Sequence, residues 1–210
     1  MRQPIKILFM LFVPLFLCLP CSALIKGGLE YQIPIDYDKL SEEELAEKAD
    51  FYYHLALISN GGEMTDALNL YAVLSRKNPN NILYKTKLGE LYDITGRDKY
   101  AKGAFFEALG VNPSHPEPYF RLGEFYYRRG MYGKALKMYK KACENGYGEH
   151  YETLYKIGDI YEKFGDTREA LKYLNAAEQI SPGSELERKI TKLECADKTN
   201  DTYYSNMRKN

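Results

Sequence analysis

The chain of 210 residues has little of what specialised sites require: it contains no Trp, three His and four Cys. Lys plus Arg and Asp plus Glu both number 29, so no excess of positive charge attracts nucleic acid. Nine Pro residues, 45% hydrophobic residues and 28% charged residues are typical of a globular chain and exclude intrinsic disorder as its main character. We therefore expect one folded domain that does not bind nucleic acid.

Motifs for catalysis, cofactors and metals are absent as well. His54, His115 and His150 are never four residues apart, so the paired zinc ligands of a helix are missing. The sequence has no phosphate-binding GxxxxGK[ST], no GxGxxG and no GxSxG nucleophile turn. The sequence predicts that the protein is not an enzyme and that it carries neither a cofactor nor a metal site.

The long hydrophobic run of the chain lies at its start. Arg2 and Lys6 precede an apolar run over 7–19, and the small residues of segment 21–23 follow it. This is the order of a secretory signal peptide. The run of about 13 apolar residues is shorter than the roughly 20 that span a bilayer. We predict a signal peptide over 1–23, cleavage after Ala23, and a periplasmic or envelope location, with secretion as the alternative.

The cysteines do not indicate redox chemistry. Cys18 and Cys21 have dithiol spacing, but they lie in the apolar stretch and no strand–helix unit surrounds them. Lipidation of Cys21 in the manner of a bacterial lipoprotein stays open, and in that case alone would a membrane tether follow. Cys143 and Cys195 of the mature chain are expected several helices apart, which favours two free thiols over a disulfide.

The remaining sequence repeats itself with a period of 34 or 35 residues. Leu55, Gly89, Gly123 and Gly158 are separated by 34, 34 and 35 residues, with one extra residue between Gly146 and His150. Three further sets follow the same shift: Ala67, Ala101, Ala135 and Ala170; Tyr71, Phe105, Tyr139 and Leu174; and Gly62, Gly96, Gly130 and Gly165. Periodicity at this length is the signature of a stacked repeat architecture.

Each unit of the repeat predicts two packed helices. An apolar series at helical spacing begins near Leu88 and stops at Gly96, and a second series begins at Ala101. Gly89 and Ala101 have no bulky side chain, so the two helices can approach closely while Phe105 fills the space between them. Neither helix can bury its apolar stripe alone, and stacking on the next pair supplies the missing surface.

This pattern resembles the tetratricopeptide repeat family, whose 34-residue unit has small, aromatic and terminal Pro positions at fixed offsets. The unit at 82–115 agrees best: Leu88, Gly89, Tyr92, Gly96, Ala101, Phe105, Ala108 and Pro113. The resemblance covers about 48–182 and implies an all-α fold, a right-handed α-solenoid of about four helix-turn-helix repeats plus a C-terminal capping helix. The repeats are expected at about 48–81, 82–115, 116–150 and 151–184, within a repeat domain over 41–182.

The ends of the repeat array carry their own signals. Ser41 with Glu44 forms a capping-box pattern that predicts the start of the first helix, and Ser184 with Glu187 predicts another start. We expect a capping helix over 184–196 that covers the fourth pair. Its apolar stripe consists of Leu186, Ile190 and Leu193. Residues 24–40 are expected to be an extended lead-in, and residues 197–210 a mobile tail.

The resemblance also implies a binding face, because such repeats bind partners on a concave surface lined by the first helix of each pair. Carried over by position, the candidate partner-binding residues are Tyr52, Thr86, Phe120 and Tyr155 at the fifth position, Glu90, Glu124 and Asp159 at the ninth, and Asp93, Tyr127, Arg128 and Glu162 at the twelfth or thirteenth. Cochaperones that bind C-terminal carboxylates carry Lys at the fifth position and Asn at the ninth, so that activity is not expected. The aromatics and carboxylates favour a basic or amide-rich partner.

Two functions remain after these exclusions. The first is a protein–protein interaction scaffold or assembly factor in the cell envelope, which binds a protein or peptide partner in the concave groove. The second is a component that binds a small ligand or polymer, with aromatic side chains stacked on it. A closed apolar pocket would favour the second function, and an open groove the first. A third interpretation, an ordinary solvated face with half-buried aromatics, also fits the sequence.

Overall fold

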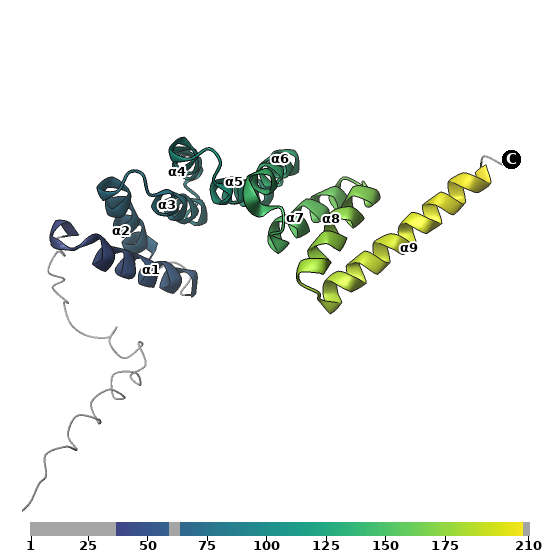
Figure 1. Cartoon of the computed structure of the whole chain (residues 1–210), viewed down its shortest axis with the longest axis horizontal. Helices are drawn as coiled ribbons and strands as arrows, with labels where there is room; N and C mark the ends of the chain where they lie inside the picture. The colour runs from purple at the N-terminus through teal and green to yellow at the C-terminus, as the bar shows by residue number, and fades with distance from the viewer. Residues whose placement is uncertain (1–36, 59–63, 208–210) are drawn as a thin grey trace, which may run out of the picture. The chain divides into compact units, whose positions relative to one another are not determined.

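The computed structural model describes residues 37–58 and 64–207, apart from the side chains of Asp38 and 199–207. These residues form helices and short turns, without a strand (Figure 1). Within the described residues, a short 3-10 helix, Tyr37–Lys39, precedes nine α-helices: α1 Glu42–Ile58, α2 Met64–Lys77, α3 Ile82–Ile94, α4 Asp98–Val111, α5 Pro116–Arg128, α6 Tyr132–Ala142, α7 Tyr151–Lys163, α8 Thr167–Ile180 and α9 Ser184–Met207. The predictions for residues 1–36, including the signal peptide and Cys21, lie outside the described residues.

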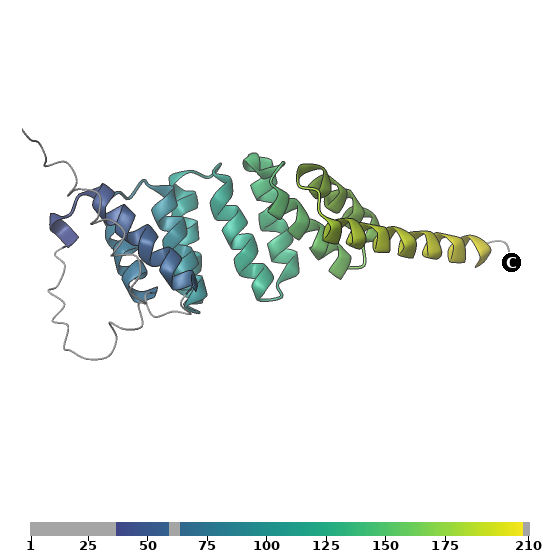
Figure 2. The same cartoon turned by 90° about the horizontal axis from the view of Figure 1, so that it is seen from below.

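The helices pack as four pairs, which confirms the predicted α-solenoid. α1 packs on α2, α3 on α4, α5 on α6 and α7 on α8, and each pair contacts the next (Figure 2). Gly96, Gly130 and Gly165 end the first helix of pairs two to four with φ values of 71°, 69° and 77°. Glycine adopts this left-handed conformation without steric cost, which explains why the predicted stops fall there.

The repeated glycines inside the pairs are needed for close helix packing. A Cβ atom on Gly89 would lie 2.6 Å from Cε1 of Phe105, and one on Gly123 would lie 2.5 Å from Cε1 of Tyr139. In the fourth pair a Cβ atom on Gly158 would lie 2.7 Å from Cγ of Leu174. The predicted close approach of a small residue to a large one is therefore confirmed in three pairs.

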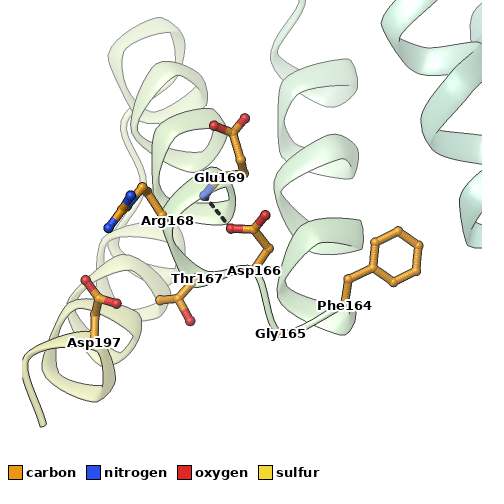
Figure 3. Close-up of a pocket in the computed structure, with 7 residues that line it drawn as sticks. All are labelled: Phe164, Gly165, Asp166, Thr167, Arg168, Glu169 and Asp197. Carbon is orange, nitrogen blue, oxygen red and sulfur yellow. Dashed lines mark hydrogen bonds between the residues drawn. The ribbon is translucent and has the colours of Figure 1, made fainter. Parts of the chain in front are cut away.

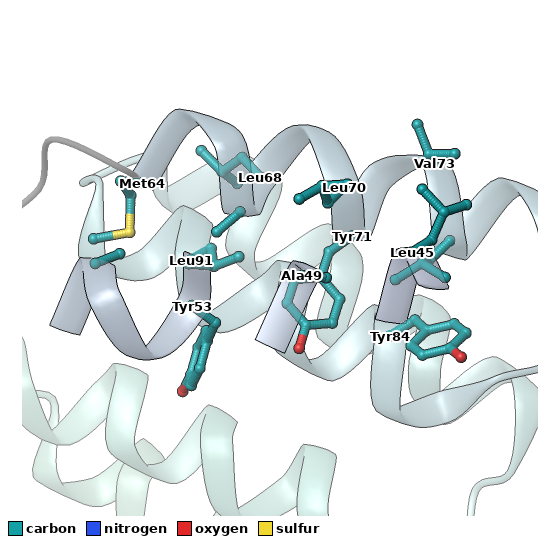
Figure 4. Close-up of a cluster of buried hydrophobic side chains, with 13 residues drawn as sticks. Leu45, Ala49, Tyr53, Met64, Leu68, Leu70, Tyr71, Val73, Tyr84 and Leu91 are labelled. Carbon is teal, nitrogen blue, oxygen red and sulfur yellow. The ribbon is translucent and has the colours of Figure 1, made fainter. Parts of the chain in front are cut away.

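A cluster of thirteen buried residues joins the first pair to α3 (Figure 4). Tyr53 of α1 and Tyr71 of α2 contribute rings to it, with centroids 6.2 Å apart, and their hydroxyl groups point to the same side. Ala56, which occupies the ninth position of the first repeat, belongs to this core. The first repeat thus contributes a core residue where the later repeats contribute acids.

The capping box at the start of α1 is confirmed. The Glu44 N–H donates to Oγ of Ser41 over 3.2 Å, and the Ser41 N–H donates to Oε2 of Glu44 over 2.9 Å. The Ser41 N–H and the Ser41 hydroxyl both donate to the Glu44 carboxylate, and these two bonds lower the pKa of Glu44. The first helix therefore begins before the repeat proper, as its sequence predicts.

The terminal helix α9 caps the fourth pair, but two details of its prediction are wrong. Leu186 and Ile190 are buried against Leu174 and Ala177, which confirms the cap. The helix continues beyond residue 196 to Met207, where a mobile tail was expected. Residues 184–207 contain no Gly or Pro, so nothing in the sequence interrupts a helix that is already nucleated by packing.

The predicted capping box of Ser184 with Glu187 does not form. α9 begins at Ser184 itself, and the Glu187 N–H donates to the Gly183 carbonyl over 3.0 Å. The Gly183 N–H in turn donates to Oε1 of Glu178 over 3.0 Å. A side chain of α8 therefore replaces the local box, because α8 and α9 pack together.

The extra residue of the third repeat produces a wide helical turn. Cys143–Tyr147 forms one π-helical turn directly after α6, and Gly146 within it has a φ of 125°. An inserted residue is commonly accommodated in this way. Burial raises the pKa of the Cys143 thiol to about 11, so it stays protonated at neutral pH. Cys143 is a free thiol, as predicted.

No helix within 37–58 and 64–207 combines the length and the apolar character that crossing a membrane requires.

Candidate partner-binding face

The first helices of the four pairs, α1, α3, α5 and α7, share one surface. We call this surface the inner face. Its bridging side chains are Tyr53, Lys87, Glu90, Asp93, Arg121, Glu124, Tyr127, Arg128, Lys156 and Asp159.

Ion pairs connect α3 to α5 and α5 to α7. Nη1 of Arg121 on α5 lies 2.8 Å from Oε1 of Glu90 on α3. Nζ of Lys156 on α7 lies 3.5 Å from Oε1 of Glu124 on α5. We call the set of such contacts the carboxylate ladder. In it, each acid at the ninth repeat position pairs with a cation two helices later in the chain.

The capping helix α9 supplies the last cation of the carboxylate ladder. Nζ of Lys189 on α9 lies 2.8 Å from Oδ1 of Asp159 and 2.8 Å from Oε2 of Glu162. Burial raises the pKa of Asp159, but hydrogen bonds from Lys189 and Tyr127 outweigh it and lower that pKa below its ordinary value. Asp159 is thus held as a carboxylate that is already paired within the chain.

A second contact between α3 and α5 lies beside the ladder. Asp93 is buried, and it accepts from the guanidinium groups of Arg128 and Arg129. Nη1 of Arg129 lies 2.8 Å from Oδ1 of Asp93. Nε of Arg129 also donates to Oδ2 of Asp98 over 2.9 Å. A buried carboxylate requires such compensation, so Asp93 holds two pairs together and is not exposed for a partner.

Tyrosine hydroxyl groups complete the pairing of the acids. Tyr53 donates to Oε2 of Glu90 over 3.2 Å, Tyr139 donates to Glu124, and Tyr127 donates to Asp159. Burial and these neighbouring carboxylates raise the pKa of Tyr139 and of Tyr127. The hydroxyl groups therefore stay protonated and act as donors.

A pocket of about 280 Å³ opens on the inner face between α1, α3 and α5. We call it the inner pocket, and it is lined by Tyr53, Leu57, Glu90, Ile94, Phe105, Arg121, Glu124 and Arg128. Leu57 and Ile94 are 51% and 48% exposed, although both are large apolar residues. The Arg128 side chain is 52% exposed beside them. The pocket thus combines exposed apolar side chains with the accessible guanidinium group of Arg128.

Two other hollows lie near α9. The first, of about 690 Å³, is lined by residues 164–169 and Asp197 (Figure 3). Its Asp166 accepts from the Glu169 N–H over 3.1 Å and caps α8, while Phe164 points away from Asp197. The second, of about 200 Å³, lies between α7 and α9. No group of His, Cys, Asp and Glu suited to a metal ion occurs among the described residues.

The structure brings most of the predicted site residues to the inner face. Glu90, Glu124 and Arg128 line the inner pocket. The others that take part in contacts between helices are Asp93, Tyr127, Asp159 and Glu162. Tyr155 lies in the hollow between α7 and α9, with Nζ of Lys189 5.1 Å from its ring centroid, and half-buried Tyr52 packs against the first core cluster.

Four predicted site residues are buried: Glu90 and Asp93 in the ion pairs described above, and Thr86 and Phe120, whose assignment to the binding face is thereby corrected. Thr86 is 2% exposed, and its hydroxyl donates to the Ile82 carbonyl over 2.8 Å. Phe120 is 3% exposed, with its ring centroid 5.8 Å from that of Tyr139 and 5.2 Å from that of His150. The fifth repeat position faces the neighbouring helices in this chain, so neither side chain is available to a partner.

Sequence reasoning missed the sixth repeat position. It holds Tyr53, Lys87, Arg121 and Lys156, so cations recur there at the repeat period. The same shift that revealed the glycines would have found them. Leu57 and Ile94 were also missed, because they do not occupy equivalent repeat positions and their exposure depends on how α1 and α3 end.

The stacked pairs and their shared inner face define an α-helical repeat protein. The sequence model of the tetratricopeptide repeat family matches residues 115–182, which contain the third and fourth helix pairs. A TPR repeat-containing protein of Methanocaldococcus jannaschii is 33% identical over 134 residues, which cover 63% of this chain and 22% of the relative. Anaphase-promoting complex subunit 6 of Arabidopsis thaliana is 29% identical over 126 residues, which cover 58% of this chain and 23% of the relative.

Solved structures share the fold. A thermophilic TPR protein of Thermus thermophilus has a TM-score of 0.59 at 22% identity, with 74% of this chain and 82% of that chain covered. A crystal structure of MamA has a TM-score of 0.57 at 20% identity, with 67% and 82% covered. The chain spans less than a quarter of the length of the two curated relatives. Proteins of this family generally mediate protein–protein interaction or assembly and are typically not enzymes.

Proposed function

We propose that this protein is an interaction or assembly protein of the cell envelope that binds a segment of a partner protein on its inner face. The observation that carries the proposal is the inner pocket, where exposed Leu57 and Ile94 stand beside the guanidinium groups of Arg121 and Arg128. Large apolar side chains exposed next to a cleft are typical of protein-binding surfaces.

The size and lining of the pocket favour a protein segment over a small ligand. Sites for small molecules usually enclose roughly 300–1,000 Å³ and are mainly apolar. The inner pocket is smaller, at about 280 Å³, and four of its lining residues are charged. It suits one side chain of a longer segment whose other contacts lie along the inner face.

The pairing of the acids changes the expected chemistry of the partner. Glu90 and Glu124 each accept from cations of the chain itself, so their charges do not require a basic partner. Arg128 retains an exposed side chain with unused donor capacity. We therefore expect the bound segment to present an apolar side chain next to a carbonyl or carboxylate acceptor.

The envelope location rests on the first 23 residues, where cations precede a short apolar run and a small-residue exit. Mass spectrometry of the protein isolated from its source cells tests it. A first residue near Leu24 supports export, and a diacylglycerol addition on Cys21 supports a tethered form. An intact Met1 in a cytosolic fraction would contradict the location.

Site-specific photocrosslinking in source cells tests the binding face. A photoreactive residue at position 57 or 94 should crosslink to the same protein, whereas one at Ile180, an exposed apolar residue of α8, is the matched control. With that protein purified, Leu57→Ser and Ile94→Ser should each weaken binding about tenfold, the loss typical of an interface anchor. Unchanged affinity in both folded variants would move the site off the inner pocket.

A further inference from the structure

The outward side of α4 differs from that of its counterparts. Gly103, Phe106 and Gly110 lie three and four residues apart, on one side of the helix, and all are exposed. Phe106 is 55% exposed. Lys102 and Glu107 flank this stripe on opposite sides. We call these five residues the α4 face.

The two glycines of the α4 face have no role inside the chain. A Cβ atom on Gly103 or Gly110 would meet no atom within 4 Å, and neither residue has the positive φ that favours glycine. Glycine is the poorest helix former after proline, so two of them in an exposed helix weaken it. A role outside the chain, the close approach of another surface, accounts for them.

The equivalent positions of later pairs are polar. A shift of 34 residues from Gly103, Phe106 and Gly110 gives Lys137, Lys140 and Glu144, and a further shift of 35 gives Lys172, Asn175 and Gln179. Solvated helices of the same array therefore carry charged and amide side chains there. The aromatic and glycine residues are specific to α4.

We propose that the α4 face binds the α4 face of a second copy of this chain, with the two helices parallel and in register. The stripe follows the spacing of the two core positions of a heptad, with glycine at one and Phe106 at the other. In such a pair Phe106 inserts into a hole formed by four residues of the second copy: Gly103, Phe106, Glu107 and Gly110. The two glycines provide the room that an aromatic ring needs.

The flanking charges select the second copy and the parallel direction. In a parallel pair, a residue on one flank faces the residue five positions later on the opposite flank of the other helix. Lys102 therefore faces Glu107 of the second copy, and twofold symmetry repeats the contact. Glu107 is 68% exposed, and its internal partner Lys85 lies 3.2 Å away on the α3 side. An antiparallel pair would bring like flanks together and would lose both contacts.

Sedimentation of the full, naturally processed chain tests the proposal. We expect a reversible dimer to appear as the protein concentration rises from about 5 to about 500 μM, because an interface of one helix pair is small. Phe106→Asn, which installs the residue of α8, should weaken dimerisation at least about tenfold. Gly103→Lys, which installs the residue of α6, should abolish it, and thermal unfolding should show that both variants remain folded. Asn175→Ala on α8 is the matched control and should change nothing.

Charge exchange tests the register. Lys102→Glu or Glu107→Lys alone should weaken the dimer, whereas the double variant should restore it. An equimolar mixture of the two single variants should form a mixed dimer, because each then offers the charge that the other needs. A wild-type chain that stays monomeric throughout overturns the proposal, as does a dimer insensitive to Phe106→Asn or a double variant that stays weak. Leu57→Ser leaves the dimer intact, so failure of the dimer is separate from failure of the inner pocket.

Discussion

The two ends of the inner face differ in how completely the chain satisfies its own side chains. From α3 to α9, each ninth-position acid meets a cation of the following helix, and Lys189 closes the last contact. At α1 the same position holds Ala56, which is buried in the core, and the sixth holds Tyr53. The carboxylate ladder therefore serves the array itself, and the proposed partner site lies where the ladder is incomplete.

The exposure of large apolar side chains also differs between the two ends of the inner face. Leu57 and Ile94 are exposed around the inner pocket at the α1 end, whereas the aromatic ring of Phe120 in the ladder region is buried. In tetratricopeptide arrays the stability of each repeat depends on contacts with its neighbours. We call the ladder contacts from Glu90 to Lys189, with the side chains packed around them, the closed region, and the part of the inner face around Leu57 and Ile94 the open region. Changes in the closed region should therefore affect folding, and changes in the open region should affect binding.

The largest expected effect is that of Phe120→Ala in the closed region. Its ring contacts Tyr139, Tyr147 and His150, so its removal leaves a cavity among aromatic side chains. We expect the free energy of unfolding to fall by about 3 to 5 kcal/mol. Urea unfolding followed by circular dichroism measures it. An unchanged midpoint with lost partner binding would instead make Phe120 the accessible anchor that its repeat position predicts.

Asp159→Asn should give the second largest effect, because it removes the last acid of the ladder. Asp159 accepts from Lys189 over 2.8 Å and from Tyr127. Hydrogen bonds to a charged group of this kind contribute about 1 to 3 kcal/mol. Glu169→Gln is the control, since Glu169 pairs with the exposed Lys172 of its own helix, and such surface pairs add little.

The same carboxylate predicts a pH dependence. Because folding lowers the pKa of Asp159 below its ordinary 3.8, its contribution is fully present above that value and is lost as pH falls through the lower folded pKa. The stability difference between wild type and Asp159→Asn should therefore be constant near neutral pH and shrink in acid below about pH 4. A difference that persists unchanged at pH 2 would show that ionisation of Asp159 does not stabilise the fold.

The sequence predicts the fold well because the fold is repeated. The glycine at 89, 123 and 158 and its large neighbour recur in three units, so each unit supports the interpretation of the others. The end of α9 was missed because a helix boundary depends on stop signals, and residues 184–207 contain neither Gly nor Pro. The failure of the Ser184 box has a similar reason: Glu178, from another helix, binds Gly183.

The site was less predictable, because it depends on contacts between helices. Repeat position correctly places Glu90 and Glu124 on the inner face, but it does not show that Arg121 and Lys156 neutralise them. It also places Phe120 on that face, where the turn around Tyr147 buries it. Spacing identifies the helix side of a residue, whereas exposure depends on the size of its neighbours in the next pair.

A smaller effect is expected for Tyr53→Phe, at the boundary between the closed and open regions. The change removes the hydroxyl that donates to Glu90 over 3.2 Å and keeps the ring beneath Lys87. Glu90 retains Arg121 and Lys87 as partners, so we expect a loss of about 0.5 to 1.5 kcal/mol in the free energy of unfolding. Chemical denaturation measures it, and a loss as large as that of Phe120→Ala would extend the closed region to α1.

The smallest effect on stability should come from Leu57→Ser and Ile94→Ser in the open region. Each side chain is about half exposed and lines the inner pocket, so its removal creates no closed cavity. Surface substitutions of this kind usually change the free energy of unfolding by less than about 0.5 kcal/mol. Both variants should therefore unfold with the wild-type midpoint while they lose affinity for the partner.

A loss of more than about 1 kcal/mol in the free energy of unfolding of either variant would be outside the usual range for a surface position. The side chain would then contribute to the core, and the two ends of the inner face would not differ as described. Retained stability with lost binding would separate the two ends, because Phe120→Ala in the third pair is expected to lose stability instead.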